Sequence, residues 1–174
     1  MFKAKLIENE NYYNLRSKHL LLTILISIPM GIFVNNFKLS IWGNLFAVSL
    51  YILMLIFLWK NQKKIQSILG NKLIEINEHE IKIKSKKGLP EEIINLNDVD
   101  KLILKDEYSM PQETMKEVGK EIVGNTKQNY LILQQKNNRR KIDFEVESYY
   151  MINQLKKVIK IWESKGYNIE RINH

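Results

Sequence analysis

The sequence of 174 residues contains no cysteine, and it has only three prolines, seven glycines and three histidines. The absence of cysteine excludes a disulfide framework and thiolate chemistry, whether as a nucleophile or as a metal ligand. Phosphate-binding loops need several closely spaced glycines, but here the glycines stand singly. The sequence also lacks G-x-S-x-G, H-E-x-x-H and P-loop motifs. We therefore expect no catalytic site, no metal and no cofactor.

The few histidines and the paired carboxylates are too scattered to indicate chemistry. His19 precedes an apolar run, His79 falls in a tight turn, and His174 ends the sequence. Carboxylates pair locally at Glu91 and Glu92, at Asp106 and Glu107, and at Asp98 and Asp100, and an acid–base or metal role could be built on the last pair. They stand beside an asparagine at the entry to a strand, where such side chains commonly cap turns. The structural interpretation is therefore favoured over the catalytic one.

Charge is nearly absent from one part of the chain, because Lys38 is the only charged residue between Lys18 and Lys60. This region contains two apolar runs. The second, Leu39–Trp59, spans about 31 Å as a helix, which matches a hydrocarbon core. The first, Leu20–Val34, is shorter and needs its flanking residues to cross. The sequence predicts a transmembrane helical hairpin over residues 19–60, with helices at about 19–37 and 39–59.

Basic residues are concentrated outside the two ends of this hairpin, and its turn carries Lys38 alone. The positive-inside rule then places both termini in the cytoplasm, in a multi-pass protein of the inner (plasma) membrane. A soluble protein with two buried helices is the competing interpretation. It is disfavoured because nothing else in the chain is large enough to enclose them. The flanking residues are Lys3, Lys5, Arg16 and Lys18 before the hairpin, and Lys60, Lys63 and Lys64 after it.

The remaining residues are assigned to a short cytoplasmic N-terminal segment, 1–18, and a cytoplasmic domain, 61–174. Ser148 is a plausible N-cap, and Gly166 a plausible stop, for a helix over about 148–165 with one apolar stripe. Residues 106–127 fit either a helix that starts near Ser109 or a strand with a long loop. Alternation of apolar and polar residues predicts strands at Leu73–Asn77, Glu80–Lys84, Glu92–Leu96, Val99–Lys105, Tyr130–Gln134 and Lys141–Val146.

This order of elements resembles the bacterial PH-like domain membrane proteins, the YcxB-like proteins. The resemblance is carried by IEINEHEIKIKS, EEIINLNDVDKLILK and NYLILQQKNNRRKIDFEVESYYMINQLKKVIKIW, over roughly residues 72–162. It implies an α+β domain, in which a bent antiparallel barrel or sheet of about seven strands is capped by the C-terminal helix. It further implies a binding or scaffolding role at the membrane. Residues 106–127 and the tail after Gly166 depart from the pattern, and the resemblance carries over no lipid-binding residue.

Basic residues are the remaining candidates for a binding site, since residues 60–174 carry a net charge of +5. Two clusters near the bilayer would attract anionic headgroups. The competing interpretation is an ordinary solvated surface in a lysine-rich protein, because lysine outnumbers arginine 23 to 4. The candidate surface comprises Lys82, Lys84, Lys86, Lys87, Arg139, Arg140 and Lys141.

We therefore expect a non-enzymatic, membrane-anchored binding module that engages a protein partner or anionic headgroups at the cytoplasmic face. Self-association through the hairpin is part of this hypothesis. Nucleic acid is not expected as a partner, because acidic residues are interspersed among the basic ones. Two alternatives stay open. One is a two-span effector of anti-phage defence with a cyclic-nucleotide sensor domain, and the other is a membrane immunity protein against a toxin.

Overall fold

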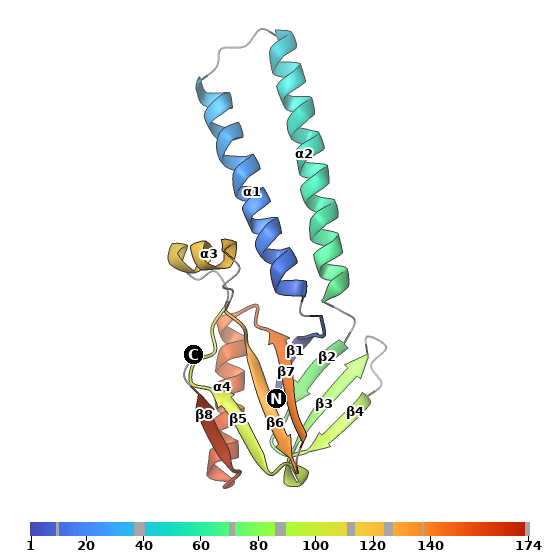
Figure 1. The fold of residues 1–174 in the computed structure, drawn as a ribbon, viewed down its shortest axis with the longest axis vertical. Coiled ribbons are helices and arrows are strands. Elements are labelled where there is room, and N and C mark those ends of the chain that lie inside the picture. Colours follow the sequence, from blue (N-terminus) through green and yellow to red (C-terminus); the bar gives the residue numbers. More distant parts are fainter. Residues whose placement is uncertain are drawn as a thin grey trace.

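A computed structural model shows two long helices standing on a curved sheet, with the C-terminal helix packed along that sheet (Figure 1). The structure describes residues 1–9, 11–36, 41–69, 72–85, 90–110, 114–123, 127–136 and 138–172. The helices are α1 (Asn11–Asn36), α2 (Ile41–Ile68), α3 (Met115–Ile122) and α4 (Tyr149–Ser164), with a short 3₁₀ turn at Leu96–Asp98. The strands are β1 (Phe2–Ile7), β2 (Lys72–Ile76), β3 (Glu80–Ser85), β4 (Pro90–Asn95), β5 (Lys101–Lys105), β6 (Tyr130–Gln135), β7 (Asn138–Glu145) and β8 (Ile169–Ile172).

The N-terminal segment is part of the sheet, which the sequence analysis did not anticipate. Strand order is β4-β3-β2-β1-β7-β6-β5-β8, so β1 lies between β2 and β7 and joins the two halves of the sheet. Phe2, Ala4 and Leu6 are buried, while Lys3 and Lys5 point outward. This alternation is the period of two of a half-buried strand, and it was readable in the sequence. The domain is therefore built from residues on both sides of the long helices, and not from residues 61–174 alone.

The sheet is mixed, whereas the sequence analysis predicted a wholly antiparallel one. Six of its seven neighbouring strand pairs are antiparallel, and β8 runs parallel to β5. The physical reason is the path of α4, which begins at the N-cap Ser148 and ends before Gly166 at φ +78°. This helix carries the chain back along the sheet, and the strand that follows it points the same way as β5. The predicted helix and both of its boundary residues are confirmed.

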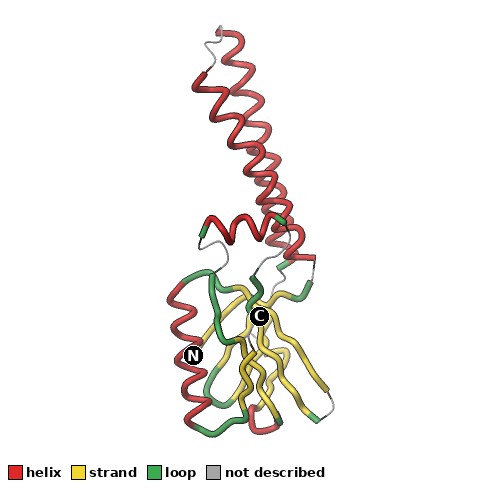
Figure 2. Tube along the Cα trace, turned by 60° about the vertical axis from the view of Figure 1, so that its left-hand side comes forward, coloured by secondary structure: helices red, strands yellow, loops and turns green. Residues whose placement is uncertain are grey.

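The core lies between the sheet and α4, which Figure 2 shows at one side of the strands. One face of α4 buries Ile152, Leu155, Val158, Ile159 and Trp162. These side chains pack with the inward residues of the strands in one cluster. The Trp162 indole is fully buried, and its Nε1 donates a hydrogen bond to the Asn77 carbonyl at 3.0 Å. This bond ties the end of α4 to the β2–β3 turn.

The two long helices run side by side and extend beyond the predicted limits (Figure 1). Among the described residues only α2 is long and apolar enough to cross a membrane, with a mean hydropathy of 2.2 over its best window. The expectation that both helices cross is therefore not shown. Helix α2 continues past Trp59 to Ile68, because Ile65 and Leu69 pack with Ile7 and Tyr12. The predicted connection between the helices falls largely on residues 37–40, outside the described residues.

Residues 106–127, left undecided by the sequence, contain the helix α3. It begins later than Ser109, because Thr114 caps it. The Thr114 hydroxyl accepts from the Glu117 amide at 3.3 Å, and the Glu117 carboxylate accepts from the Thr114 amide at 3.2 Å. This reciprocal capping box satisfies two backbone donors at the helix start. Helix α3 packs on the lower part of α1.

Candidate functional site

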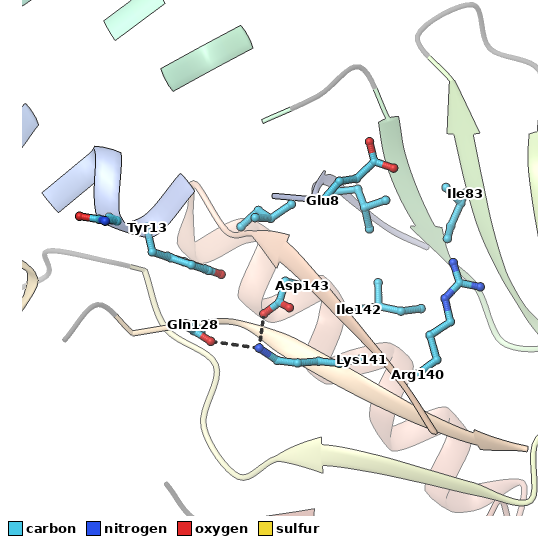
Figure 3. A pocket seen from close by; sticks show the side chains of 11 residues that line it. Glu8, Tyr13, Ile83, Gln128, Arg140, Lys141, Ile142 and Asp143 are labelled. Atoms are coloured by element: carbon cyan, nitrogen blue, oxygen red, sulfur yellow. Dashed lines mark hydrogen bonds and ion pairs between the residues drawn. The ribbon is translucent and has the colours of Figure 1, made fainter. Parts of the chain in front are cut away.

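A pocket of about 720 Å³ opens below the first turn of α1, between β7 and β3 (Figure 3). Its walls come from five places in the chain: the end of β1, the start of α1, β3, the segment before β6, and β7. Leu6, Ile7, Ile83 and Ile142 supply an apolar floor. The polar residues around it are Glu8, Tyr13, Asn14, Gln128, Arg140, Lys141 and Asp143.

The pocket depends on the curvature of the sheet. Strands β7 and β4 are separated by three other strands in the sheet order, yet Arg140 of β7 reaches Glu92 of β4. Arg140 Nη2 donates to Glu92 Oε2 at 2.9 Å. The same hydrogen bonding holds the pKa of the Glu92 carboxyl below its ordinary value. This ion pair crosses one side of the pocket between strands that a flat sheet would hold far apart.

The basic residues of the pocket face acidic partners. Lys141 Nζ lies 2.9 Å from Asp143 Oδ1 and donates to Gln128 Oε1 at 3.0 Å (Figure 3). Glu8 pairs with Lys72 at 2.8 Å. The pocket therefore carries both signs of charge in near balance. An isolated anion gains little in such a site, because each cation already has a counter-charge.

Tyr13 gives the pocket a polar group that the fold leaves unused. Its hydroxyl oxygen is buried and has no hydrogen-bond partner among the described residues. Burial raises the pKa of this phenol, so it remains a neutral donor. Buried polar groups in native proteins are generally paired, so an unpaired hydroxyl on a residue that lines a pocket is unusual.

The candidate basic surface is not one continuous face. Lys82 and Lys84 alternate with the buried Ile81 and Ile83, and so they lie on the outer side of β3. Lys82 pairs with Glu80, and Lys84 pairs with the buried Glu75. Arg140 and Lys141 are consecutive on β7, so their side chains leave the strand on opposite faces, yet the pocket extends to both. Arg140 and Lys141 both line the pocket, Arg139 is exposed at the start of β7, and Lys86 and Lys87 lie outside the described residues.

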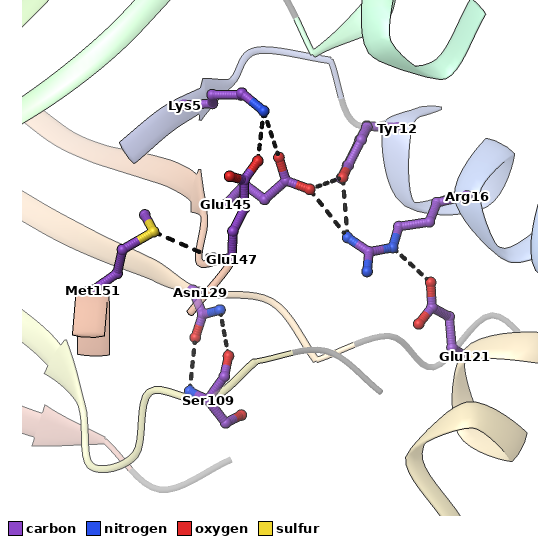
Figure 4. Close-up of polar contacts among 9 residues, drawn as sticks. All are labelled: Lys5, Tyr12, Arg16, Ser109, Glu121, Asn129, Glu145, Glu147 and Met151. Carbon is purple, nitrogen blue, oxygen red and sulfur yellow. Dashed lines mark hydrogen bonds and ion pairs between the residues drawn. The ribbon is translucent and has the colours of Figure 1, made fainter. Parts of the chain in front are cut away.

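A second polar cluster joins the base of α1 to the domain and to α3 (Figure 4). The Tyr12 hydroxyl donates to Glu145 Oε1 at 2.7 Å, and Arg16 Nη1 lies 3.3 Å from the same oxygen. Arg16 Nε donates to Glu121 Oε1 at 2.8 Å, and the Glu121 side chain is only 2% exposed. Next to it, the Ser17 hydroxyl donates to the Ile122 carbonyl at 3.1 Å. These contacts fix the first two turns of α1 to both neighbours.

Sequence reasoning missed this cluster. It identified Arg16 only as a topology signal and gave no role to Glu121, which lies 105 residues further along the chain. Charge pairs so distant in sequence leave no periodic pattern to detect. Asp100, weighed as a catalytic candidate, instead accepts a hydrogen bond from the Lys136 amide in the β6–β7 turn. Among the described residues, no group of three or more histidines, aspartates or glutamates could hold a metal ion.

Comparison of the chain with models of protein families, with curated proteins and with solved structures finds no match. The geometry of the pocket and of the α1 base therefore carries the functional argument.

Proposed function

We propose that this protein is a non-enzymatic, membrane-anchored binding module of the PH-like kind, and that its pocket holds a segment of a protein partner. The observation that carries the proposal is the pocket itself, with an apolar floor, a charge-balanced rim and the unpartnered Tyr13 hydroxyl. Protein interfaces combine an apolar centre with a polar rim in the same way. A site for anionic headgroups would instead leave its cations unneutralised.

The membrane anchor is supported first by α2, whose large apolar side chains are mostly exposed to the surroundings. Trp42, Phe46, Leu53 and Trp59 are each more than half exposed. An exposed apolar area of this extent is typical of a surface that faces lipid. Trp42 and Trp59 lie toward the two ends of the apolar stretch, where indole rings favour the headgroup region.

The pairing of β1 with β2 bears on the number of membrane crossings. These strands precede α1 and follow α2, and they are hydrogen-bonded neighbours in one sheet. Both therefore lie on the same side of a membrane. If α2 crosses, the chain must cross a second time between Ile7 and Lys72, and α1 is the other long helix in that interval. This argument supports a two-helix anchor, and the positive-inside rule then places the sheet in the cytoplasm.

The PH-like assignment is supported by the strand order and by α4. Strands β1 to β4 follow one another outward from the middle of the sheet, and β7 to β5 do so on the other side. The C-terminal helix α4 covers the core between them. The eighth strand and α3 are additions to the arrangement that the resemblance implies.

Photo-crosslinking from the rim of the pocket tests the proposed binding. A photoreactive amino acid replaces the exposed Asn14 in the full chain, in the membranes of the producing cell. We expect one discrete protein-sized adduct. Arg140→Glu should abolish it, because this change places a second carboxylate against Glu92. The matched control is the same photoreactive residue at the exposed Lys157 of α4, which should give no such adduct.

The outcomes are separable. A lipid-sized adduct from position 14 would replace the protein partner with a headgroup. Equal adducts from positions 14 and 157, or none from either, would refute binding at the pocket. A reporter fused after His174 tests the orientation separately: activity on the far side of the membrane would overturn the cytoplasmic placement.

A further inference from the structure

Helix α3 lies outside the sheet and across the base of α1, a position that the binding pocket does not explain. The ribbon and the tube view both place it beside the lower part of α1 and above the strands (Figures 1 and 2). It is held there by the Arg16–Glu121 ion pair and the hydrogen bond from Ser17 to the Ile122 carbonyl. Two properties indicate what the free face of α3 contacts: its position relative to the apolar part of α1, and the residues that it exposes.

The contact with Ser17 fixes the position of α3 along the axis of α1. That residue precedes the apolar run at Leu20 by three positions, about 5 Å along a helix. A helix with its side chains has a radius of about 5–6 Å. The upper side of α3 therefore reaches the level at which α1 becomes apolar. The membrane boundary inferred for α1 and α2 thus continues onto α3.

The free face of α3 has two halves. Around the helix axis, Met115, Gly119 and Val123 follow one another on one half, and Lys116 and Lys120 occupy the other. Met115 is 85% exposed and Val123 is 71% exposed. The opposite face carries the buried Glu121 and is turned to α1. An apolar strip with lysines along one side is the composition of helices that lie in a membrane interface.

We propose that α3 is an interfacial helix that rests on the cytoplasmic leaflet of the bilayer, with Met115 and Val123 inserted and the two lysines among anionic headgroups. The proposal rests on the membrane anchoring proposed above. Its consequence is that the domain has a second membrane contact besides the long helices. That contact restrains rotation of the sheet about the α1–α2 axis, and so it fixes the direction in which the pocket faces.

Fluorescence depth measurements test this in the full chain, which is naturally free of cysteine and so accepts single labels. An environment-sensitive dye is attached at Met115→Cys or Val123→Cys in vesicles of phosphatidylglycerol and phosphatidylethanolamine. Leu53→Cys in α2 is the membrane control, and the exposed Lys157→Cys in α4 is the water control. We expect blue-shifted emission and quenching by spin-labelled lipid at positions 115 and 123, less deep than at 53, and neither effect at 157.

Gly119 offers a matched pair of variants in the middle of the apolar strip. A Cβ built at this position meets no atom, so larger side chains fit. Leucine and glutamate have similar helix propensities, so G119L and G119E alter the helix itself alike. G119L should increase lipid quenching of the label at position 115, and G119E should decrease it. Identical quenching in the two variants would overturn the proposal.

The result at position 53 separates this proposal from the membrane anchor. Quenching at 53 with water-like emission at 115 and 123 would refute the interfacial role of α3 and leave the anchor intact. Water-like emission at all of these positions would refute both. Quenching at 115 that matches the depth of 53 would also contradict an interfacial position.

Discussion

Removal of the Glu121 carboxylate should release α3 from α1 without unfolding the sheet. Arg16 Nε donates to Glu121 Oε1 at 2.8 Å, and the two side chains are 20% and 2% exposed. In Glu121→Ala, Arg16 keeps its contacts with Tyr12 and Glu145. Helix α3 lies outside the sheet and contributes no residue to the main core cluster. Detachment of α3 from α1 should therefore leave the sheet and its core folded.

The magnitude follows from the kind of bond. A hydrogen bond between charged groups with little exposure contributes about 1.5–3 kcal/mol. Because Glu145 still partly compensates Arg16, we expect a loss of about 2 kcal/mol in the local opening free energy of α3. That corresponds to a roughly 30-fold increase in the opening equilibrium. Glu121→Gln keeps a neutral acceptor, so it should lose about half as much free energy.

Hydrogen exchange on the full chain in vesicles measures this opening residue by residue. Amides of residues 118–123 should exchange about 30-fold faster in Glu121→Ala, in line with the free energy above. Amides of β6 and β7 should keep their protection. Glu163→Gln is the control, because Glu163 pairs with Arg171 on the exposed surface, where both side chains are 42% accessible. Such pairs contribute about 0–1 kcal/mol.

Two results would refute the reasoning. Unchanged exchange in α3 would mean that the Arg16–Glu121 pair does not hold it. Equal acceleration in α3 and in the sheet would mean that the ion pair supports the whole domain, and that α3 is not a separately attached element.

Four further predictions concern the stability of the sheet, of α3 and of the end of α4. Hydrogen bonds from Lys3 and Lys84 lower the pKa of Glu75 in the folded state, against the opposing effect of burial. This stabilisation is complete above the unfolded pKa of about 4.3 and is lost as pH falls through the lower folded pKa. Glu75→Gln should therefore flatten the acid dependence of urea unfolding, and an unchanged dependence would contradict it. Gly166→Ala should lower stability by about 1–2 kcal/mol because φ is +78°. Gly119→Ala, at an ordinary helical position, should instead stabilise α3 by about 1 kcal/mol in hydrogen exchange. Trp162→Phe should cost about 1–3 kcal/mol in urea unfolding because it leaves the Asn77 carbonyl without its donor, and a loss below 0.5 kcal/mol would contradict that reason.

Much of the secondary structure was predictable because it is encoded by local periodicity. The strands from Lys72 to Ser85 show the alternation that places Ile74, Ile76, Ile81 and Ile83 in the core. The boundaries of α4 follow from a single N-cap hydroxyl and a single glycine. Helix α3 was less clear, because its capping box begins at Thr114, five residues beyond the predicted start near Ser109.

The candidate site was predictable only in part. Arg140 and Lys141 were selected from their charge, and both line the pocket. Charge alone gave no indication that Glu92 and Asp143 would neutralise them, since Glu92 is 48 residues away from Arg140. The same composition is consistent with an anion-binding face and with a neutral, mixed-charge pocket. Only the pairing in space distinguishes the two.

By itself the sequence determined most of the strands, the bounds of α4 and the apolar surface that α2 presents to its surroundings, because these properties depend on residues close together in the chain. The tertiary structure decided that β1 lies between β2 and β7, that β8 runs parallel to β5, and that Arg16 meets Glu121. Each of these depends on a contact between distant segments, set by how the sheet curves and buries its apolar face. No periodicity within one segment encodes that curvature.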